Sequence, residues 1–175
     1  MSITRPDWLL PPIEELDYFP VEQIGKQLAN ICRYAGATPH FYSVARHSML
    51  VNSLVPNEPH LKLMALMHDA HECWIGDILR PAKRWCGRAV DDLEKTYDRK
   101  IWALLALDPS PVDDAFIAKA DDEACRLELL WLGKSFVDIE HDDIFQRYWL
   151  SPRPQQQMDS VKWIEAVREL MMELD

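Results

Sequence analysis

Apolar residues recur along this chain at intervals of three and four positions, the spacing that gathers side chains on one face of an α-helix. Residues 21–34 show this spacing with Ile24, Leu28 and Ile31. A sheet protein would instead alternate apolar and polar residues and would turn about every eight to twelve residues. The chain has no sustained alternation and only five glycines in 175 residues, so the sequence predicts an all-α fold.

The clearest helix start lies at Ser110, a residue type that caps helix N-termini. Pro111 suits the first helical position, and Asp113 and Asp114 complement the helix dipole in the first turn. The pattern predicts a bundle of about six main helices in a single domain over residues 1–175. The predicted helices cover residues 21–34, 43–54, 60–74, 88–107, 110–133 and 157–174, and the predicted loops cover 1–20, 75–87 and 134–156.

Charge and hydropathy exclude two classes of partner. The 19 Lys and Arg residues against 29 Asp and Glu residues give a net charge of -10, which repels nucleic-acid polymers and anionic membranes. The longest apolar stretch near the middle, Ile101–Leu107, is far shorter than the roughly 20 residues that a membrane span needs. Residues 1–20 are acidic where a secretory signal would be basic and then apolar. We therefore expect a cytoplasmic protein that neither spans a membrane nor binds nucleic-acid polymers.

The cysteines predict no disulfide framework. Cys32, Cys73, Cys86 and Cys125 are spread along the chain without a CxxC pair. This distribution is typical of reduced and mostly buried thiols, and it argues against a zinc-knuckle arrangement.

His68 and Asp69 interrupt an apolar helical face within the string Leu66-Met67-His68-Asp69-Ala70. A carboxylate taken out of water costs several kcal/mol unless a cation or strong donors compensate it. An imidazole beside a carboxylate supplies the nitrogen and oxygen ligands that divalent transition metals prefer. A His-Asp pair on an exposed helix face would have no such role, so the pair by itself leaves both interpretations open.

Two other predicted helices offer matching ligands. His47 lies shortly after Ser43, and Asp121 lies in the 110–133 helix. Glu72 follows His68 by four residues, so on a continuous helix it would point into the same pocket. Imidazoles and carboxylates that converge from three helices would form a partly filled metal shell, with open positions for water and a phosphate oxygen.

The order of His47, His68-Asp69 and Asp121 resembles the HD-domain phosphohydrolases. The string Tyr42-Ser43-Val44-Ala45-Arg46-His47-Ser48 looks like the first-histidine segment of the deoxynucleotidase branch of that family. His68-Asp69-Ala70-His71-Glu72 with the following Gly76-Asp77, Pro81 and Lys83 is similar to its HDAxE segment. Arg33-Tyr34-Ala35-Gly36 resembles its Arg-aromatic-small-Gly step, and Asp121 with Glu128 follows its last motif. The resemblance covers roughly residues 21–130.

The resemblance implies an HD-domain helical bundle and a role for each matching residue. It implies a divalent transition metal (Zn, Co, Mn or Fe), with a possible second divalent ion such as Mg. Glu72 would act as the acid or base, and Asp77 would orient that machinery or help to hold the second ion. Arg33 and Lys83 would neutralise phosphate oxygens. The implied metal ligands are His47, His68, Asp69 and Asp121.

The resemblance also implies the substrate class, a small-molecule deoxynucleotide hydrolysed at its 5′ α-phosphate. The short chain is similar to phage-encoded dATP triphosphohydrolases, which favours release of deoxynucleoside and triphosphate. A 5′-deoxynucleotidase that acts on dNMPs is the alternative. Tyr34, Phe41, Tyr42 and Trp74 lie close enough to the motifs to stack on a base, or else they belong to the core. Tyr42 and Trp74 are our candidate substrate contacts.

Three further expectations complete the hypothesis. A non-catalytic nucleotide-binding HD scaffold would have little use for costly buried carboxylates, and a di-iron oxygenase would need paired Glu-x-x-His motifs. Outside the motif, we expect His40, His60 and His141 to be exposed and Asp122 to be solvated. For His71, both an orientation towards the pocket and one away from it stay open. Five large apolar residues predict a homo-oligomer, because a small domain hides so much aromatic surface with difficulty. They are Trp102, Leu105, Trp131, Trp149 and Trp163.

Overall fold

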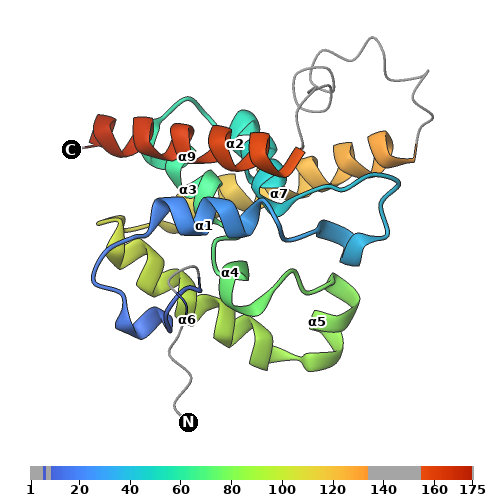
Figure 1. Ribbon diagram of the computed structural model, residues 1–175, viewed down its shortest axis with the longest axis horizontal. Helices are drawn as coiled ribbons and strands as arrows, with labels where there is room; N and C mark the ends of the chain where they lie inside the picture. Colours follow the sequence, from blue (N-terminus) through green and yellow to red (C-terminus); the bar gives the residue numbers. More distant parts are fainter. Residues whose placement is uncertain (1–5, 7–8, 134–154, 175) are drawn as a thin grey trace.

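A computed structural model describes Pro6, residues 9–133 and residues 155–174, without the side chain of Gln155. The described residues form helices and one isolated bridge between Cys32 and Ser43, with no strand among them. The all-α prediction is therefore confirmed (Figure 1). The α-helices are α1 (Val21–Leu28), α2 (Val44–Leu54), α3 (Pro59–Met67), α4 (Glu72–Ile75), α5 (Arg80–Cys86), α6 (Arg88–Leu104), α7 (Pro111–Leu132) and α9 (Gln155–Leu174), and the 3-10 helices are η1 (Ile13–Glu15) and η2 (Arg33–Gly36).

Two of the predicted helices are shorter than expected. The helix predicted over 21–34 ends at Leu28, because the next residues turn to pair with the start of α2: the Arg33 N–H donates to the Tyr42 carbonyl at 2.9 Å. The helix predicted over 60–74 is wrong as one continuous element. It stops at Met67, and the Ala70 N–H then bonds back to the Met67 carbonyl at 2.8 Å in a tighter turn before α4 begins.

Part of the predicted loop structure is also helical. The segment expected to be loop over 75–87 contains α5, with a proline in its first turn, and Gly87 ends it at a φ of 64°. The predicted loop over 1–20 contains η1. The predicted loop over 134–156 lies mostly outside the described residues, as do His141 and Trp149. Local apolar periodicity missed α5 because this helix buries none of its residues.

Helix α2 runs through the centre of the bundle, and every residue from Val44 to Val51 is buried. It contacts α3, α7 and α9, while α9 packs mainly on α1 and α3. The close approach of α9 requires a glycine on α1: a Cβ on Gly25 would lie 2.6 Å from Ile164 Cγ1. In Figure 1, α9 and the pair α5 and α6 lie on opposite sides of the bundle.

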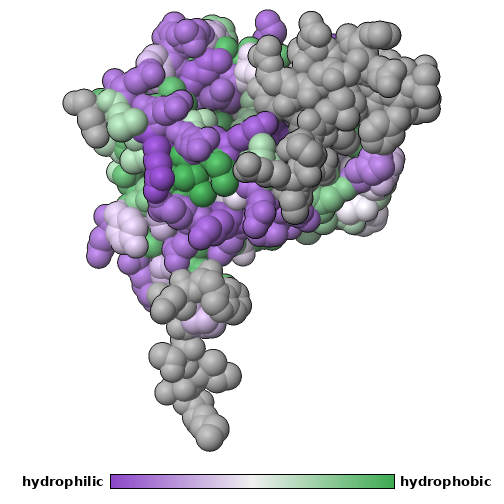
Figure 2. All heavy atoms as spheres, turned by 45° about the horizontal axis from the view of Figure 1, so that its top comes forward, coloured by the Kyte–Doolittle hydropathy of each residue, from purple (hydrophilic) through white to green (hydrophobic). Residues whose placement is uncertain are grey.

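The hydropathy of the surface and of the helices can be compared with the expectation that the protein does not span a membrane. Outside the grey residues, the face seen in Figure 2 is mainly hydrophilic, and its hydrophobic area is framed by polar side chains. In the part of the chain that the structure describes, no helix combines the length and the apolar character that crossing a bilayer requires.

Most of the large apolar residues that predicted a homo-oligomer pack against the core of the chain itself. Trp131 and Trp163 are buried, and Trp102 and Leu105 are partly buried against the core. That basis for the homo-oligomer is therefore removed, and the homo-oligomer stays a prediction. Among the described residues, Trp85 is the most exposed aromatic residue, at 92%, ahead of Tyr18 and Phe116.

Candidate metal centre and active site

A hydrogen bond at Nδ1, on the side of the ring that faces away from the site, fixes the orientation of His47. Ser43 caps α2, since its hydroxyl accepts the Arg46 N–H at 3.1 Å, and this cap places His47 in the buried first turn. The His47 Nδ1–H donates to Glu128 Oε1 at 2.6 Å. The imidazole therefore turns Nε2 towards the site, as in metal sites where a carboxylate orients the ligand histidine.

His68 is oriented in the same way by a backbone group. It follows the last residue of α3, and its Nδ1–H donates to the Ala65 carbonyl at 2.8 Å. Its Nε2 lies 3.3 Å from Nε2 of His47. Two lone pairs at this distance repel each other unless a proton or a metal ion lies between them. Burial lowers the pKa of His68, but the charges of Asp69 and Asp121 outweigh it and raise the pKa to about 9.

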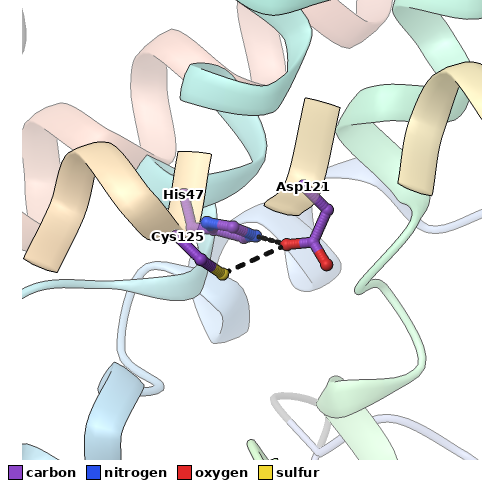
Figure 3. A group of neighbouring side chains, drawn as sticks. All are labelled: His47, Asp121 and Cys125. Carbon is purple, nitrogen blue, oxygen red and sulfur yellow. Dashed lines mark hydrogen bonds and ion pairs between the residues drawn. The ribbon is translucent and has the colours of Figure 1, made fainter. Parts of the chain in front are cut away.

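Two carboxylates complete this cluster. Asp69 Oδ2 lies 3.2 Å from His68 Nε2 and 3.5 Å from His47 Nε2. Asp121 Oδ1, from α7, lies 3.0 Å from His47 Nε2 (Figure 3). Burial acts to raise the pKa of Asp121, but its hydrogen bond with His47 and the charge of His68 lower the pKa to about 2. The structure thus brings together all four ligands that the sequence predicted, from α2, the end of α3 and α7.

The spacing of these donor atoms suits a metal ion. The ligand atoms of His47, His68 and Asp69 lie within 4.8 Å of one another, and so do those of His47, Asp121 and Cys125. His47 Nε2 belongs to both groups. The described residues therefore contain His, Asp and Cys groupings that are able to hold a metal ion.

Two further residues of α7 belong to the site: Cys125, which the sequence did not single out as a ligand, and Glu128, which the motif included without a role. Cys125 follows Asp121 by one helical turn, and Glu128 follows it by two, so all three lie on one face of α7. Glu128 is fully buried; besides His47 it accepts hydrogen bonds from the hydroxyls of Tyr34 at 2.6 Å and Tyr42 at 2.9 Å. The seven-residue spacing after Asp121 was the available signal for Glu128.

The thiols are less buried than the sequence predicted. All four cysteines are free, but Cys86 is exposed and the other three are only half-buried. Burial raises the pKa of Cys125 to about 12. The absence of a disulfide framework is confirmed for these residues, whereas the expectation that they are mostly buried is wrong.

A strained turn presents Arg33 to the site. Tyr34 and Ala35 adopt φ values of 56° and 51°, a left-handed conformation that costs non-glycine residues free energy. The Tyr34 N–H donates to Asp77 Oδ2 at 3.1 Å, which helps to hold the turn. Arg33 is 8% exposed, and its guanidinium lies 3.4 Å from both Asp69 Oδ2 and Glu128 Oε2. Asp77 thus contacts the turn that carries Arg33, and it also lines the cavity beside the cluster.

A cavity of about 240 Å³ opens beside the cluster. Three cationic side chains line it: Arg33, Arg80 and Lys83. Their charges stand out in a chain whose net charge is -10. The other lining residues are Tyr34, Asp69, Glu72, Asp77, Ile78, Leu79, Pro81, Asp121, Cys125 and Leu129.

Glu72 faces this cavity from the first turn of α4. It is 4% exposed, and among the described residues no group donates a hydrogen bond to its Oε2. Burial, with the nearby charges of Asp69 and Asp77, raises the pKa of Glu72 to about 10. The geometry thus places a buried carboxyl group beside the candidate ligands, as predicted, although it does so through a turn and not along one helix.

The two aromatic residues expected to contact substrate lie elsewhere. Tyr42 is 1% exposed in the core, and the Trp74 indole N–H donates to the Pro11 carbonyl at 2.8 Å. Neither lines the cavity. Each ring finds a partner for its polar tip inside the fold, which is typical of core aromatic residues.

The remaining histidines and Asp122 mostly follow expectation. His71 pairs with α6, its Nδ1 lying 2.8 Å from Asp98 Oδ1, and it does not line the cavity, although one ring nitrogen lies within 4.8 Å of ligand atoms of Asp69 and Glu72. His40 is exposed and His60, at the start of α3, is half-exposed. Asp122 is solvated, and its carboxylate pairs with Arg80 at 3.1 Å.

Comparison with known proteins gives relatives without an assigned activity. No family model matches the chain. The uncharacterized protein RCAP_rcc00048 of Rhodobacter capsulatus is 34% identical over 155 residues, which are 83% of this chain and 76% of that protein. The uncharacterized protein YfdR of Escherichia coli K12 is 50% identical over 64 residues, 37% of this chain, and the match spans 35% of the length of YfdR.

Proposed function

This chain belongs to the family of the uncharacterized Rhodobacter capsulatus protein RCAP_rcc00048, and from the geometry of its site we propose that it is a metal-dependent phosphohydrolase of the HD-domain type. Its proposed substrates are deoxynucleotides, cleaved at the 5′ α-phosphate. A dNTP, dATP in particular, would yield deoxynucleoside and triphosphate.

One observation carries the proposal: the Nε2 atoms of His47 and His68 face each other at 3.3 Å. Both rings are held so by partners on their Nδ1 side. At this distance the two Nε2 atoms need a proton or a metal ion between them, and in a metal-loaded site a cation would take that place with both nitrogens as ligands. The adjacent carboxylates add oxygen ligands, and such a mixed set suits Zn, Co, Mn or Fe(II).

Phosphate-ester hydrolysis requires charge neutralisation, a nucleophile and a proton for the leaving oxygen. A divalent ion bound here would supply Lewis-acid activation of water and of the phosphoryl group. Arg33 and Lys83 line the cavity and are positioned to neutralise phosphate oxygens. Glu72, whose Oε2 has no donor among the described residues, is free to exchange a proton with the water or with the leaving 5′ oxygen.

The cations that line the cavity favour an anionic substrate. Arg80 lies on the solvent side of the cavity with its side chain 60% exposed, and it pairs there with Asp121 at 3.3 Å and Asp122 at 3.1 Å. A triphosphate group has more negative charge than a monophosphate, so it would compete better with these carboxylates for the guanidinium. This charge supports a dNTP over a dNMP.

The test is product analysis with dATP and dAMP side by side, with Mn²⁺, Co²⁺ and Zn²⁺ each supplied in turn. We expect deoxyadenosine and triphosphate from dATP. Phosphate from dAMP alone would contradict the triphosphohydrolase and identify a 5′-deoxynucleotidase instead. No product from either nucleotide with any ion would overturn the enzyme proposal in favour of a nucleotide-binding scaffold. Asp69→Ala, which removes a metal ligand and also one carboxylate partner of Arg33, serves as the inactive control.

A further inference from the structure

Cys125 extends the candidate ligand set by a sulfur atom. It lies one turn after Asp121 on α7, and its Sγ is 3.5 Å from Asp121 Oδ1. Both ligand atoms lie within 4.8 Å of His47 Nε2 and of each other. Figure 3 shows the three side chains pointing towards one another from α2 and α7. Ligands of one tetrahedral zinc ion, at bond lengths of about 2.0–2.3 Å, lie roughly 3.3–3.8 Å apart, so the Sγ–Oδ1 distance suits a shared ion.

Two independent features of the same cavity point to a cation there. One is the facing pair of Nε2 atoms on His47 and His68, 3.3 Å apart. The other is Glu72, which is 4% exposed and lines the cavity with an oxygen that accepts no hydrogen bond from the described residues. The sulfur therefore belongs to a cluster of ligands and is not an isolated thiol.

Two guanidinium groups near Sγ favour a sulfur anion, while the carboxylates of Asp121 and Glu128 oppose it until a metal ion binds. The Arg33 guanidinium donates to Sγ at 3.3 Å, and Arg80 donates at 3.7 Å. A thiol is a weak acceptor, whereas a thiolate gains fully from charged donors. A bound divalent ion deprotonates a coordinating thiol outright. The two guanidinium groups would then compensate the negative charge that the sulfur adds beside Asp121.

We propose that Cys125 is a metal ligand of this site, a thiolate that joins His47 and Asp121 and makes the site prefer Zn²⁺ and Co²⁺ over Mn²⁺ and Mg²⁺. On binding, the S–H bond breaks, its proton passes to the buffer and a sulfur–metal bond forms, with no change of oxidation state. Soft ligands select such ions, and hard oxygen ligands suit Mn²⁺ and Mg²⁺. The inference rests on the metal site of the proposed function but not on the hydrolysis.

Cobalt spectroscopy tests the sulfur bond directly. The full chain is loaded with Co²⁺ as wild type, Cys125→Ser and, as a matched control, Cys86→Ser, which changes an exposed cysteine away from the cluster. We expect a near-ultraviolet sulfur-to-cobalt band in the wild type and the control, and its loss in Cys125→Ser with the visible cobalt bands retained. The same near-ultraviolet absorption in Cys125→Ser as in the wild type, or no such band in the wild type, would overturn the proposal.

Two further measurements keep the test independent of variant folding and of catalysis. X-ray absorption of the zinc-loaded wild type should show a sulfur scatterer at about 2.3 Å, and nitrogen and oxygen scatterers alone at about 2.0–2.2 Å would refute the ligand. The preference for Zn²⁺ over Mn²⁺, from competition with a chelator, should fall by about tenfold or more in Cys125→Ser; an unchanged preference would refute the selectivity. A sulfur signal without nucleotide hydrolysis would reject only the proposed function, and hydrolysis without a sulfur signal would reject only Cys125 as a ligand.

Discussion

Arg46 and His47 are neighbours on α2, yet their side chains enter two different buried polar networks. Arg46 turns towards α9, where its Nε and NH2 groups donate to Asp159 Oδ1 at 3.2 and 2.9 Å. The Ser43 hydroxyl donates to the other oxygen of Asp159 at 2.7 Å. Arg46 and Asp159 are each 2% exposed, so this network is closed: its charges are balanced inside the protein.

The His47 network is open. Glu128 occupies Nδ1 of the ring, but Nε2 faces His68, Asp69 and Asp121 at the edge of a cavity. Imidazole nitrogens and carboxylate oxygens converge there on one point, and Arg33 and Arg80 pair with the carboxylates from the side of the cavity. The comparison of the Arg46 and His47 networks shows that burial of charge by itself does not mark a functional site. A buried network marks one when it leaves donor atoms pointing at a common, reachable point.

The largest expected effect is a loss of turnover, and it should differ between Asp69 and Glu72 in whether the metal is lost as well. Asp69→Ala should abolish both metal uptake and hydrolysis, because it removes a ligand. Glu72→Ala should keep the metal but lower kcat by about 100- to 10 000-fold, the usual contribution of a positioned acid or base. Metal content by elemental analysis, with turnover of dATP, checks both. Equal loss of metal in the two variants would show that Glu72 is a ligand.

The closed network predicts a loss of stability with no loss of metal affinity. Asp159→Ala leaves the Arg46 guanidinium buried without this partner, and breaking such a pair should lower the free energy of unfolding by about 3–5 kcal/mol. Denaturant unfolding measures it. The control is Glu165→Ala, which changes an exposed residue of α9 and should stay within about 0.5 kcal/mol of the wild type. A drop in the metal affinity of the folded Asp159→Ala variant would break the distinction between the two networks.

A substitution of Glu128 tests whether its hydrogen bond to Nδ1 of His47 is needed to orient that ring towards the site. Glu128→Gln keeps the shape of the side chain but removes the charge that orients His47 and pairs with Arg33. We expect the affinity for zinc to fall by about 10- to 100-fold, as for other groups that hold a ligand histidine. Competition with a chromogenic chelator measures this change. An unchanged affinity would mean that packing by itself holds the ring.

The smallest effect is expected on α5, the wall of the cavity that buries no residue. Trp85 is 92% exposed, so Trp85→Ala should change the free energy of unfolding by no more than about 0.5 kcal/mol. Light scattering of the same variant addresses the predicted homo-oligomer. A particle that shrinks to 20.4 kDa only in Trp85→Ala would show that this wall is a subunit contact. A loss of stability above about 1 kcal/mol would show that Trp85 is covered in solution.

Helix types and the four candidate ligands were predictable from the sequence because their signals are local. Ser110 does cap α7, in a capping box with Asp113, and Ile24 and Leu28 do face the core. The course of the chain after Met67 was less predictable. Its apolar pattern continues, but backbone bonds of a tighter turn replace the helical ones, and this turn carries Asp69 and Glu72 to the cavity.

The all-α character was predictable from the sequence because helical periodicity and capping act over a few residues. The candidate ligands His47, His68, Asp69 and Asp121 followed from the resemblance of short motifs. Only the tertiary structure decided which of the other polar residues serve the site. Arg46 meets Asp159 across 113 positions and His47 meets Glu128 across 81. Such pairs form when helices pack, because a buried charge must find a partner wherever the fold provides one.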